Sequence, residues 1–214
     1  MADFPDPWPL RHLVLRTPRL ELRPDDDAGL LELVDEAQHG VHPPDEMPFN
    51  VPWTDAAPAE LGPNTLAFYW SQRVSLRAGS WGVNFLVRLD GRVIGNQGLS
   101  GTRLALTREV STGSWIGLRH QGKGIGTEMR AAVLMFAFDH LGALRARSAA
   151  AEENLRSRGV SRRLGYVEDG SETVVVRDRA TTHVRLVLAA EKFARPDWEL
   201  TVSGLDGCRS LLVT

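Results

Sequence analysis

The chain has little of what marks several common classes of protein. Its 214 residues include one cysteine, Cys208, which excludes an internal disulfide framework and a metal cluster built from cysteines. A formal net charge of −2 gives no sign of general binding to nucleic acid or to an anionic membrane. No segment approaches eighteen apolar residues without a charge, and residues 1–5 lack the regions of a signal peptide. We therefore expect a cytoplasmic protein with neither nucleic-acid nor membrane partners.

The histidines do not indicate a metal site. His39 and His42 lie three residues apart near Asp45 and Glu46, but in a proline-rich segment that lacks helical spacing. A hydrophobic fraction of 43% and a charged fraction of 24% are ordinary for a globular protein, and the length is that of one domain. We expect no bound metal.

Hydrophobic periodicity and turn residues predict alternating strands and helices. Asp25–Asp27 are expected to cap a first helix and Asn64 a second one, and Asp90-Gly91 is a strong hairpin signal. Strands are expected at 20–22, 81–88, 92–99, 109–118, 144–149, 173–176 and 183–188. Two further helices should follow residue 126 and begin at Asn154.

The most informative segment is the glycine loop, Gln121–Gly126, which joins the strand at 109–118 to an apolar helix. Such a loop brings backbone N–H groups to the positive end of a helix, which favours binding of a phosphate. The dinucleotide pattern G-x-G-x-x-G fails at Thr127, and the P-loop pattern fails because Gly124 stands where a hydroxyl is required. The pattern Q/R-x-x-G-x-G/A matches at every defined position, and a glycine-rich turn without a ligand remains the alternative.

A second segment, Asn154–Tyr166, supports one interpretation of the glycine loop. Asn154 is a good helix N-cap, Val160 and Leu164 lie on one helical stripe, and Gly165 supplies a stop. The segment resembles the pattern N-x-x-S-x-x-V-x-x-x-L-G-F/Y of the GNAT acyltransferases, and the glycine loop resembles their pyrophosphate loop. The resemblance covers roughly residues 11–190. It implies an α+β fold of α/β/α layers, with a mixed, mostly antiparallel twisted sheet of about seven strands and about four helices.

The resemblance also implies a domain organisation and a co-substrate. Residues 1–10 would be an irregular N-terminal segment, 11–190 the acyltransferase domain, and 191–214 an extension packed on the domain or on an oligomer partner. A coenzyme A thioester, acetyl-CoA or succinyl-CoA, would be the acyl donor. The residues implied in binding it are Trp115, Ile116, Leu118, Gln121, Gly122, Lys123, Gly124, Ile125, Gly126, Thr127, Asn154 and Ser157.

Candidate catalytic residues are fewer. A backbone N–H of the strand before the glycine loop would face the thioester oxygen. The family often places a glutamate on that strand; the carboxylate present is Glu109, whereas the aligned position falls nearer Ser111. Ser161 stands where many members have a tyrosine that protonates the leaving thiolate. Because a coenzyme A thiolate has a pKa near that of cysteine, ~8.5, a dedicated acid is dispensable.

Residues 38–62 contain five prolines and should form a long loop, since proline interrupts regular helices. A loop of this length is usually functional or disordered, and its apolar residues argue against disorder. The loop either packs over the site or only closes the core or an oligomer contact. If it packs over the site, its substrate-facing residues are His42, Met47, Phe49 and Trp53.

The start of the chain narrows the resemblance. Thr17–Pro24 looks like the opening of the Rim-type branch, and residues 40–54 resemble an actinobacterial subgroup that includes a mycobacterial succinyl-CoA-using GNAT. The function implied is acyl transfer to a small-molecule or peptide amine, by a protein expected to form homo-oligomers. A catalytically silent CoA-binding or regulatory module is the alternative, and a P-loop nucleotide enzyme is a more distant one.

Overall fold

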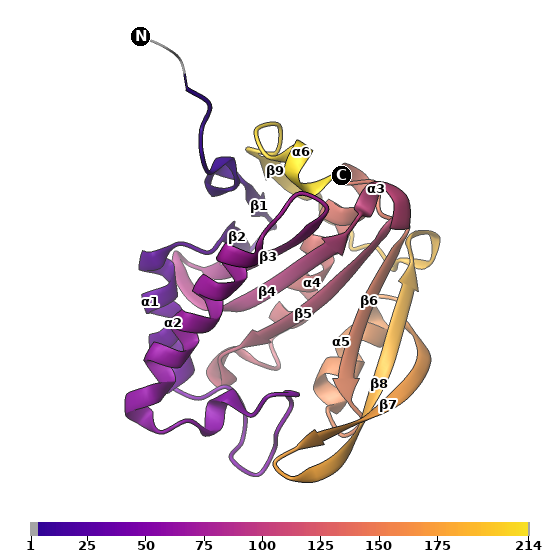
Figure 1. The fold of residues 1–214 in the computed structure, drawn as a ribbon. Helices are drawn as coiled ribbons and strands as arrows, with labels where there is room; N and C mark the ends of the chain where they lie inside the picture. Colours follow the sequence, from indigo (N-terminus) through magenta and orange to yellow (C-terminus); the bar gives the residue numbers. More distant parts are fainter. Residues whose placement is uncertain (1–3, 214) are drawn as a thin grey trace.

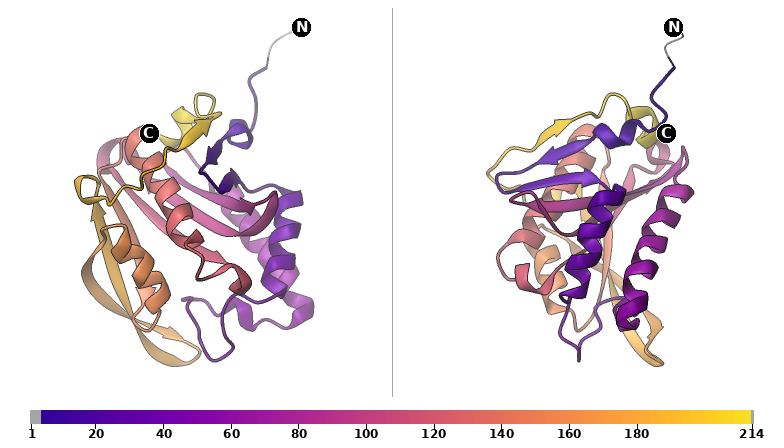
Figure 2. Two further views of the ribbon diagram at one scale, coloured as in Figure 1. Left: turned by 180° about the vertical axis from the view of Figure 1, so that it is seen from behind. Right: turned by 90° about the vertical axis from the view of Figure 1, so that its left-hand side faces the viewer.

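A single twisted sheet forms the centre of the molecule (Figures 1 and 2). The computed structural model of the chain describes residues 4–213, and within them nine strands lie in the order β7-β8-β6-β5-β4-β3-β2-β1-β9. Only β5 and β6 run parallel; every other neighbouring pair is antiparallel. The strands are β1 (Val14–Arg16), β2 (Leu20–Pro24), β3 (Ser80–Leu89), β4 (Arg92–Thr102), β5 (Glu109–Ile116), β6 (Arg145–Ala151), β7 (Val167–Val176), β8 (Arg179–Ala189) and β9 (Thr201–Ser203).

Helices cover both faces of the sheet (Figure 2). Helices α1 (Asp27–Gln38) and α2 (Pro58–Ser75) pack on one face, and α4 (Ile125–Met135) and α5 (Leu155–Arg163) pack on the other. Two short helices, α3 (Leu104–Thr107) and α6 (Arg209–Leu212), bring the number in the described chain to six. The remaining turns are 3₁₀-helical at Pro9–His12, Trp53–Asp55, Leu118–His120 and Ala190–Lys192, and π-helical at Phe136–His140.

The layered α+β fold with a mixed, mostly antiparallel sheet confirms the predicted class, with nine strands and six α-helices against about seven and about four. The two additional strands, β1 and β9, have three residues each, which is too short to show an alternating pattern. Helix α4 lies against the sheet with almost every side chain buried, including Met129, Val133 and Leu134. Nowhere in residues 4–213 is a helix both long enough and apolar enough to cross a bilayer.

The predicted start of the second helix was wrong. Helix α2 begins at Pro58, not at Asn64, because proline is well suited to the first position of a helix. Pro63 lies inside α2 close to its start, where its missing N–H costs one intrahelical hydrogen bond. Helical spacing predicts that Leu66, Trp70 and Val74 form the buried stripe of this helix, which is also wrong: Tyr69 is 3% exposed, whereas Trp70 is 46% exposed.

The C-terminal residues pack against the beginning of the chain. Strand β9 pairs with β1, and Leu205, Cys208 and Leu212 are buried in the main core. The indole Nε1 of Trp81 on β3 donates a buried hydrogen bond of 2.8 Å to the carbonyl oxygen of Leu212. Of the predicted terminal segments, residues 1–3 and Thr214 lie outside the described residues. The helical turn Pro9–His12 begins at the end of the segment 1–10, which was expected to be irregular.

The Trp81–Leu212 hydrogen bond generates a stability prediction. Trp81→Phe should lower the free energy of unfolding by roughly 1–3 kcal/mol, because it leaves a buried carbonyl without a partner. Trp70→Phe is the matched control, since it removes a hydrogen bond to Asp27 that is exposed to water. Urea denaturation of both variants measures the effect. An equal loss of unfolding free energy in the two variants would show that the hydrogen bond to Leu212 does not hold the C-terminal residues against β3.

Candidate functional site

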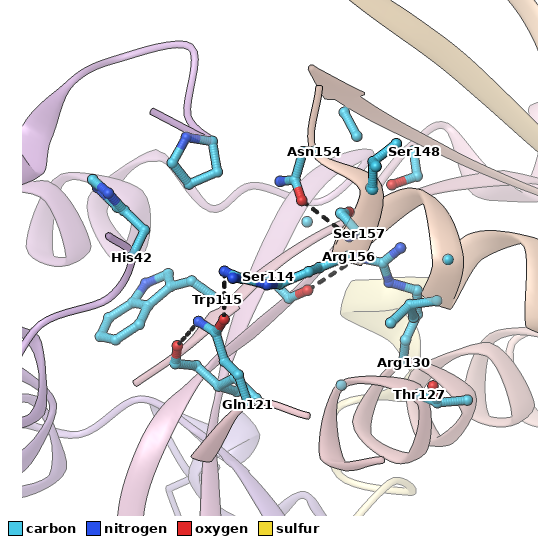
Figure 3. A pocket seen from close by; sticks show the side chains of 18 of the residues that line it. His42, Ser114, Trp115, Gln121, Thr127, Arg130, Ser148, Asn154, Arg156 and Ser157 are labelled. Carbon is cyan, nitrogen blue, oxygen red and sulfur yellow. Dashed lines mark hydrogen bonds between the residues drawn. The ribbon is translucent and has the colours of Figure 1, made fainter. Parts of the chain in front are cut away.

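The site begins where the parallel strands β5 and β6 separate. Strands β5 and β6 are paired at three positions, from Glu109↔Arg145 to Ser111↔Arg147, although both strands continue beyond them. We call the separated parts, residues 112–116 and 148–151, the fork. A cavity of about 660 Å³ opens between the two arms, with α5 and the glycine loop on its other sides (Figure 3). At the base of the fork Ser148 Oγ donates to the carbonyl oxygen of Thr112 at 3.2 Å.

The glycine loop lies at the open end of the fork and leads directly into α4. Gly122 and Gly124 have φ angles of +74° and +79°, which favour glycine, and Gly124 is the N-cap of α4. The first N–H groups of the helix, at Ile125 and Gly126, have no intrahelical acceptor by geometry. Because Gly122, Gly124, Gly126 and Thr127 all line the cavity, the positive end of α4 faces it.

The side chain of Gln121 bonds to backbone carbonyls of two other segments. Its Nε2 donates to the carbonyl oxygens of Val41 and Ile116, at 2.8 Å and 3.0 Å. The amide thus ties the glycine loop to the end of β5 and to the loop at 39–57. Lys123 is exposed and its Nζ donates to the carbonyl oxygen of Arg119 at 2.9 Å.

Four rings, which we call the aromatic chain, fasten the loop at 39–57 to β5. His42, Phe49, Trp53 and Trp115 follow one another with centroid separations of 5.8, 5.3 and 5.4 Å. Trp115 Nε1 donates to the hydroxyl of Tyr69 on α2 at 3.1 Å, and burial raises the pKa of that hydroxyl above its ordinary value. Both ring nitrogens of His42 have partners, Pro43 O and Thr54 Oγ1. The loop is therefore held as one wall of the cavity.

Positive charge surrounds the cavity. Arg156, Arg162 and Arg163 of α5 are exposed at its rim, and Arg130 of α4 reaches into it from below the fork (Figure 3). Arg130 is 4% exposed and donates to Ser161 Oγ at 2.9 Å and to Ser114 Oγ at 3.1 Å. Burial lowers the pKa of its guanidinium from the ordinary arginine value.

Comparison with known proteins agrees with this geometry. Residues 13–167 match the family model described as an acetyltransferase (GNAT) domain. The chain belongs to the GNAT acetyltransferase family. The predicted fold and family are confirmed by this match.

Solved GNAT-like structures share the fold at low sequence identity. Mycobacterium smegmatis RimJ in complex with CoA-disulfide is 20% identical, with a TM-score of 0.67 and 94% of each chain covered. Spermidine N-acetyltransferase from Vibrio cholerae, in complex with CoA and spermine, is 18% identical with a TM-score of 0.60, over 82% of this chain and 98% of that one. A GNAT-family acetyltransferase from Bacillus anthracis is 14% identical, with a TM-score of 0.64 over 83% and 99%.

Most of the predicted GNAT site residues meet in the cavity. Those that line it are His42, Phe49, Trp115, Ile116, Gln121, Gly122, Gly124, Gly126, Thr127, Asn154 and Ser157. Asn154 is the N-cap of α5, and its Oδ1 accepts from the backbone N–H of Ser157 at 3.0 Å. Among residues 4–213, no group of three or more His, Cys, Asp or Glu side chains is arranged to hold a metal ion.

The other predicted residues lie elsewhere. Ile125 is buried in the core, and the backbone N–H of Leu118 donates to the carbonyl oxygen of Gly40. Lys123, Met47 and Trp53 are absent from the cavity wall in the described chain, although the Trp53 ring contacts that of Trp115, which does line the cavity. Glu109 lies at the closed end of the β5–β6 pair, where the guanidinium of Arg147 holds it at 2.8 Å.

A second, smaller cavity lies on the α2 side of the sheet. Its volume is about 280 Å³, and its polar lining side chains include Gln72, Asn84, Ser100 and Ser111. Gly113 lines both cavities, and a Cβ atom placed on it would meet nothing within 4 Å. Gly113 has no side chain, and so it places none between the two cavities.

Sequence reasoning missed Arg130 and Ser114. An arginine in a helix is ordinarily assigned to solvent, but Arg130 lies within a run in which all positions from Glu128 to Met135 are buried. The signal available in the sequence was that the neighbours of Arg130, from Met129 to Met135, are otherwise all apolar. Ser114 follows from strand alternation, since it faces the same side of β5 as the buried Thr112 and Ile116.

The two hydrogen bonds of Gln121 generate a prediction about the loop. Gln121→Met should leave the carbonyl oxygens of Val41 and Ile116 without this donor and cost roughly 1–3 kcal/mol of local stability. Amide hydrogen exchange at residues 40–55 should become faster while α4 stays protected. Gln38→Met, on an exposed position of α1, is the control. Unchanged exchange at 40–55 would mean that the aromatic chain alone holds the loop.

Proposed function

We propose that the protein is an acyl-CoA-dependent N-acyltransferase that uses acetyl-CoA or succinyl-CoA and transfers the acyl group to an amine. The observation that carries this proposal is the fork of β5 and β6 with the N-terminus of α4 at its open end. The fork offers unpaired strand edges, and the helix end offers N–H groups and a positive dipole. Coenzyme A has the complementary chemistry: phosphates at one end and a long arm of amide groups that leads to the thioester.

In the proposed complex the diphosphate lies against the backbone N–H groups of residues 122–127. The arginines of α5 at the rim neutralise part of its charge. The pantetheine arm then enters the fork beside Gly113–Ile116, and the amide of Asn154 contacts it from α5. This path brings the thioester to the base of the fork, near Gly113 and Ser148.

The reaction is a direct attack of the amine on the thioester carbon. A backbone N–H of the β5 edge would stabilise the negative charge that develops on the carbonyl oxygen. The acceptor would approach through the second cavity, because Gly113 opens onto both spaces. Neither cavity is lined by Glu109, so the attacking nitrogen loses its proton to water or to another acceptor group in this scheme.

The acceptor is a small-molecule or peptide amine in this proposal. The uncharged, polar lining of the second cavity suits an amine that arrives neutral. We place the enzyme in the cytoplasm, where acyl-CoA is available, and expect it to work as a homo-oligomer. A catalytically silent CoA-binding module is the second candidate, favoured by the ion pair that engages Glu109 and by Ser161, a poor acid; release of coenzyme A during incubation with amines distinguishes the two.

The glycine loop generates a binding prediction. In Gly126→Val a side chain would fill the space between α4 and α5, where a Cβ atom lies 3.6 Å from Val160 and the backbone needs no positive φ. The fold should survive, while affinity for coenzyme A should fall at least tenfold, about 1.4 kcal/mol. Isothermal titration calorimetry measures the affinity, with Gly207→Val, far from the cavity, as control.

Thermal unfolding gives an independent check of ligand class, since a ligand bound only to the native state raises Tm. Acetyl-CoA should raise the Tm of the wild-type protein and of Gly207→Val, and ATP with Mg²⁺ should do much less. Stabilisation by ATP alone, or normal CoA affinity in Gly126→Val, would contradict this assignment of the loop.

The choice of acyl donor can also be predicted. From the resemblance of residues 40–54 we expect succinyl-CoA to be accepted at least as well as acetyl-CoA. The extra carboxylate needs a cation or several N–H donors to offset its desolvation, and four arginines line the cavity. Comparing kcat/KM for the two donors with one amine decides it. A hundredfold preference for acetyl-CoA, about 2.7 kcal/mol of transition-state binding, would contradict the expectation.

A further inference from the structure

Arg130 is the one charged side chain of the cavity that is held inside it and not at the rim. It extends from α4 toward β5 and Ser114 (Figure 3). Its two Nη atoms donate to the hydroxyls of Ser161 on α5 and Ser114 on β5. Its Nε is buried without a hydrogen-bond partner. Two neutral hydroxyls therefore orient the guanidinium.

The charge of Arg130 is uncompensated in the free protein. Among the described residues no carboxylate is paired with it. The titratable group that interacts with its charge is Tyr166, whose pKa is raised by burial. Arginine nevertheless stays protonated in proteins. A buried cation without an anion is costly, and such sites are found where a ligand or a reaction supplies the anion.

The position of Arg130 indicates which anion this is. Ser114 lies one residue beyond Gly113, at the base of the fork, where the strands converge and the proposed donor arm ends. The diphosphate belongs to the other end of the arm, at the glycine loop. The unpaired N–H groups of β5 are available for the carbonyl oxygen. The remaining negative charge at this point is the one that forms on sulfur.

We infer that Arg130 is a catalytic residue that binds the coenzyme A sulfur and stabilises the departing thiolate. This rests on the proposed acyl transfer. The amine lone pair forms the C–N bond, and the C–S bond then breaks with its electron pair going to sulfur. The nitrogen releases one proton to water, so that amide, thiolate and proton are the products. The guanidinium keeps its protons and acts by charge and hydrogen bonding, which replaces a proton donor at Ser161.

A titration of the bound thiol must take account of the groups around Arg130. It bonds to Ser114 of β5 and to Ser161 of α5. The hydroxyl of Tyr166, in the segment before β7, interacts with its charge and bonds to Thr112. The other charged side chains that line the same cavity are Glu46 on the loop and the arginines of α5, all of them exposed. The imidazole of His42 also lines it.

The experiment measures the thiol pKa of coenzyme A bound to the full-length protein. Thiolate absorbance in the ultraviolet is followed against pH, with desulfo-coenzyme A as the blank. In the wild-type complex the thiol pKa should lie about one unit or more below that of free coenzyme A, because a cation in contact favours the anion. In Arg130→Met it should rise to the free value or above it, since burial alone disfavours a thiolate. Arg130→Lys should restore part of the shift.

Two controls separate this role from a structural one. Arg162→Met makes the same change at an exposed arginine of the same cavity and should leave the thiol pKa at its wild-type value. Arg130→Met should unfold at a Tm no lower than the wild type in the absence of ligand, because an unpaired buried charge has been removed. Its kcat should fall at least tenfold with acetyl-CoA and succinyl-CoA alike.

The outcomes are distinct. An unshifted thiol pKa in the wild-type complex, or the same shift in Arg130→Met, overturns the inference while leaving CoA binding intact. A loss of turnover confined to succinyl-CoA also overturns it, because the guanidinium would then bind the acyl carboxylate. Failure of the wild-type protein to bind coenzyme A at all overturns the proposed function, and this inference with it.

Discussion

The site depends on the early separation of the one parallel strand pair in the sheet. The hydrogen-bond ladder between β5 and β6 stops after Ser111 and Arg147. Beyond these residues each strand has an edge whose backbone groups no longer pair with the other strand. Unpaired strand edges are ordinarily a liability, since they invite pairing with another chain. Here the opening is bounded by α5, the glycine loop and the loop at 39–57. The helix α4 begins at the same opening, which adds its positive end to the unpaired edges.

Which parts of the fold and the site could be predicted depends on how far apart in the sequence the interacting residues lie. The glycine loop, its place before α4 and the N-cap at Asn154 depend on neighbours within a few residues, and local pattern predicts them. The buried face of α2 depends on a contact between Tyr69 and Trp115, which are 46 residues apart, and periodicity alone pointed to the wrong stripe. The hydrogen bond from the Gln121 side chain to Val41, 80 residues away, is likewise invisible in a local motif. Short strands such as β9 carry too few residues for any pattern to be visible.

The contacts of Arg130 could not be predicted from local sequence patterns either, and its burial adds an energetic argument. Its place in an apolar part of the helix is unfavourable for stability, and residues 4–213 supply two hydroxyls but no counter-ion. Side chains that break a local rule without compensation are expected at functional sites, where stability is given up for binding or catalysis. The exposed arginines of α5 need no such explanation, because water solvates them. A buried charge next to the base of the fork therefore says more about the chemistry of the site than the number of charges around its rim.

The central claim is that coenzyme A lies in the fork, with its phosphates on the glycine loop. Hydrogen exchange of the backbone amides with and without coenzyme A tests this most directly, because it reports on the unpaired strand edge itself. The account predicts slower exchange at residues 113–116 and 122–127 on binding, with the distant strands β1 and β9 unchanged. Protection confined to other parts of the chain, with residues 113–116 exchanging as fast as in the free protein, would contradict it.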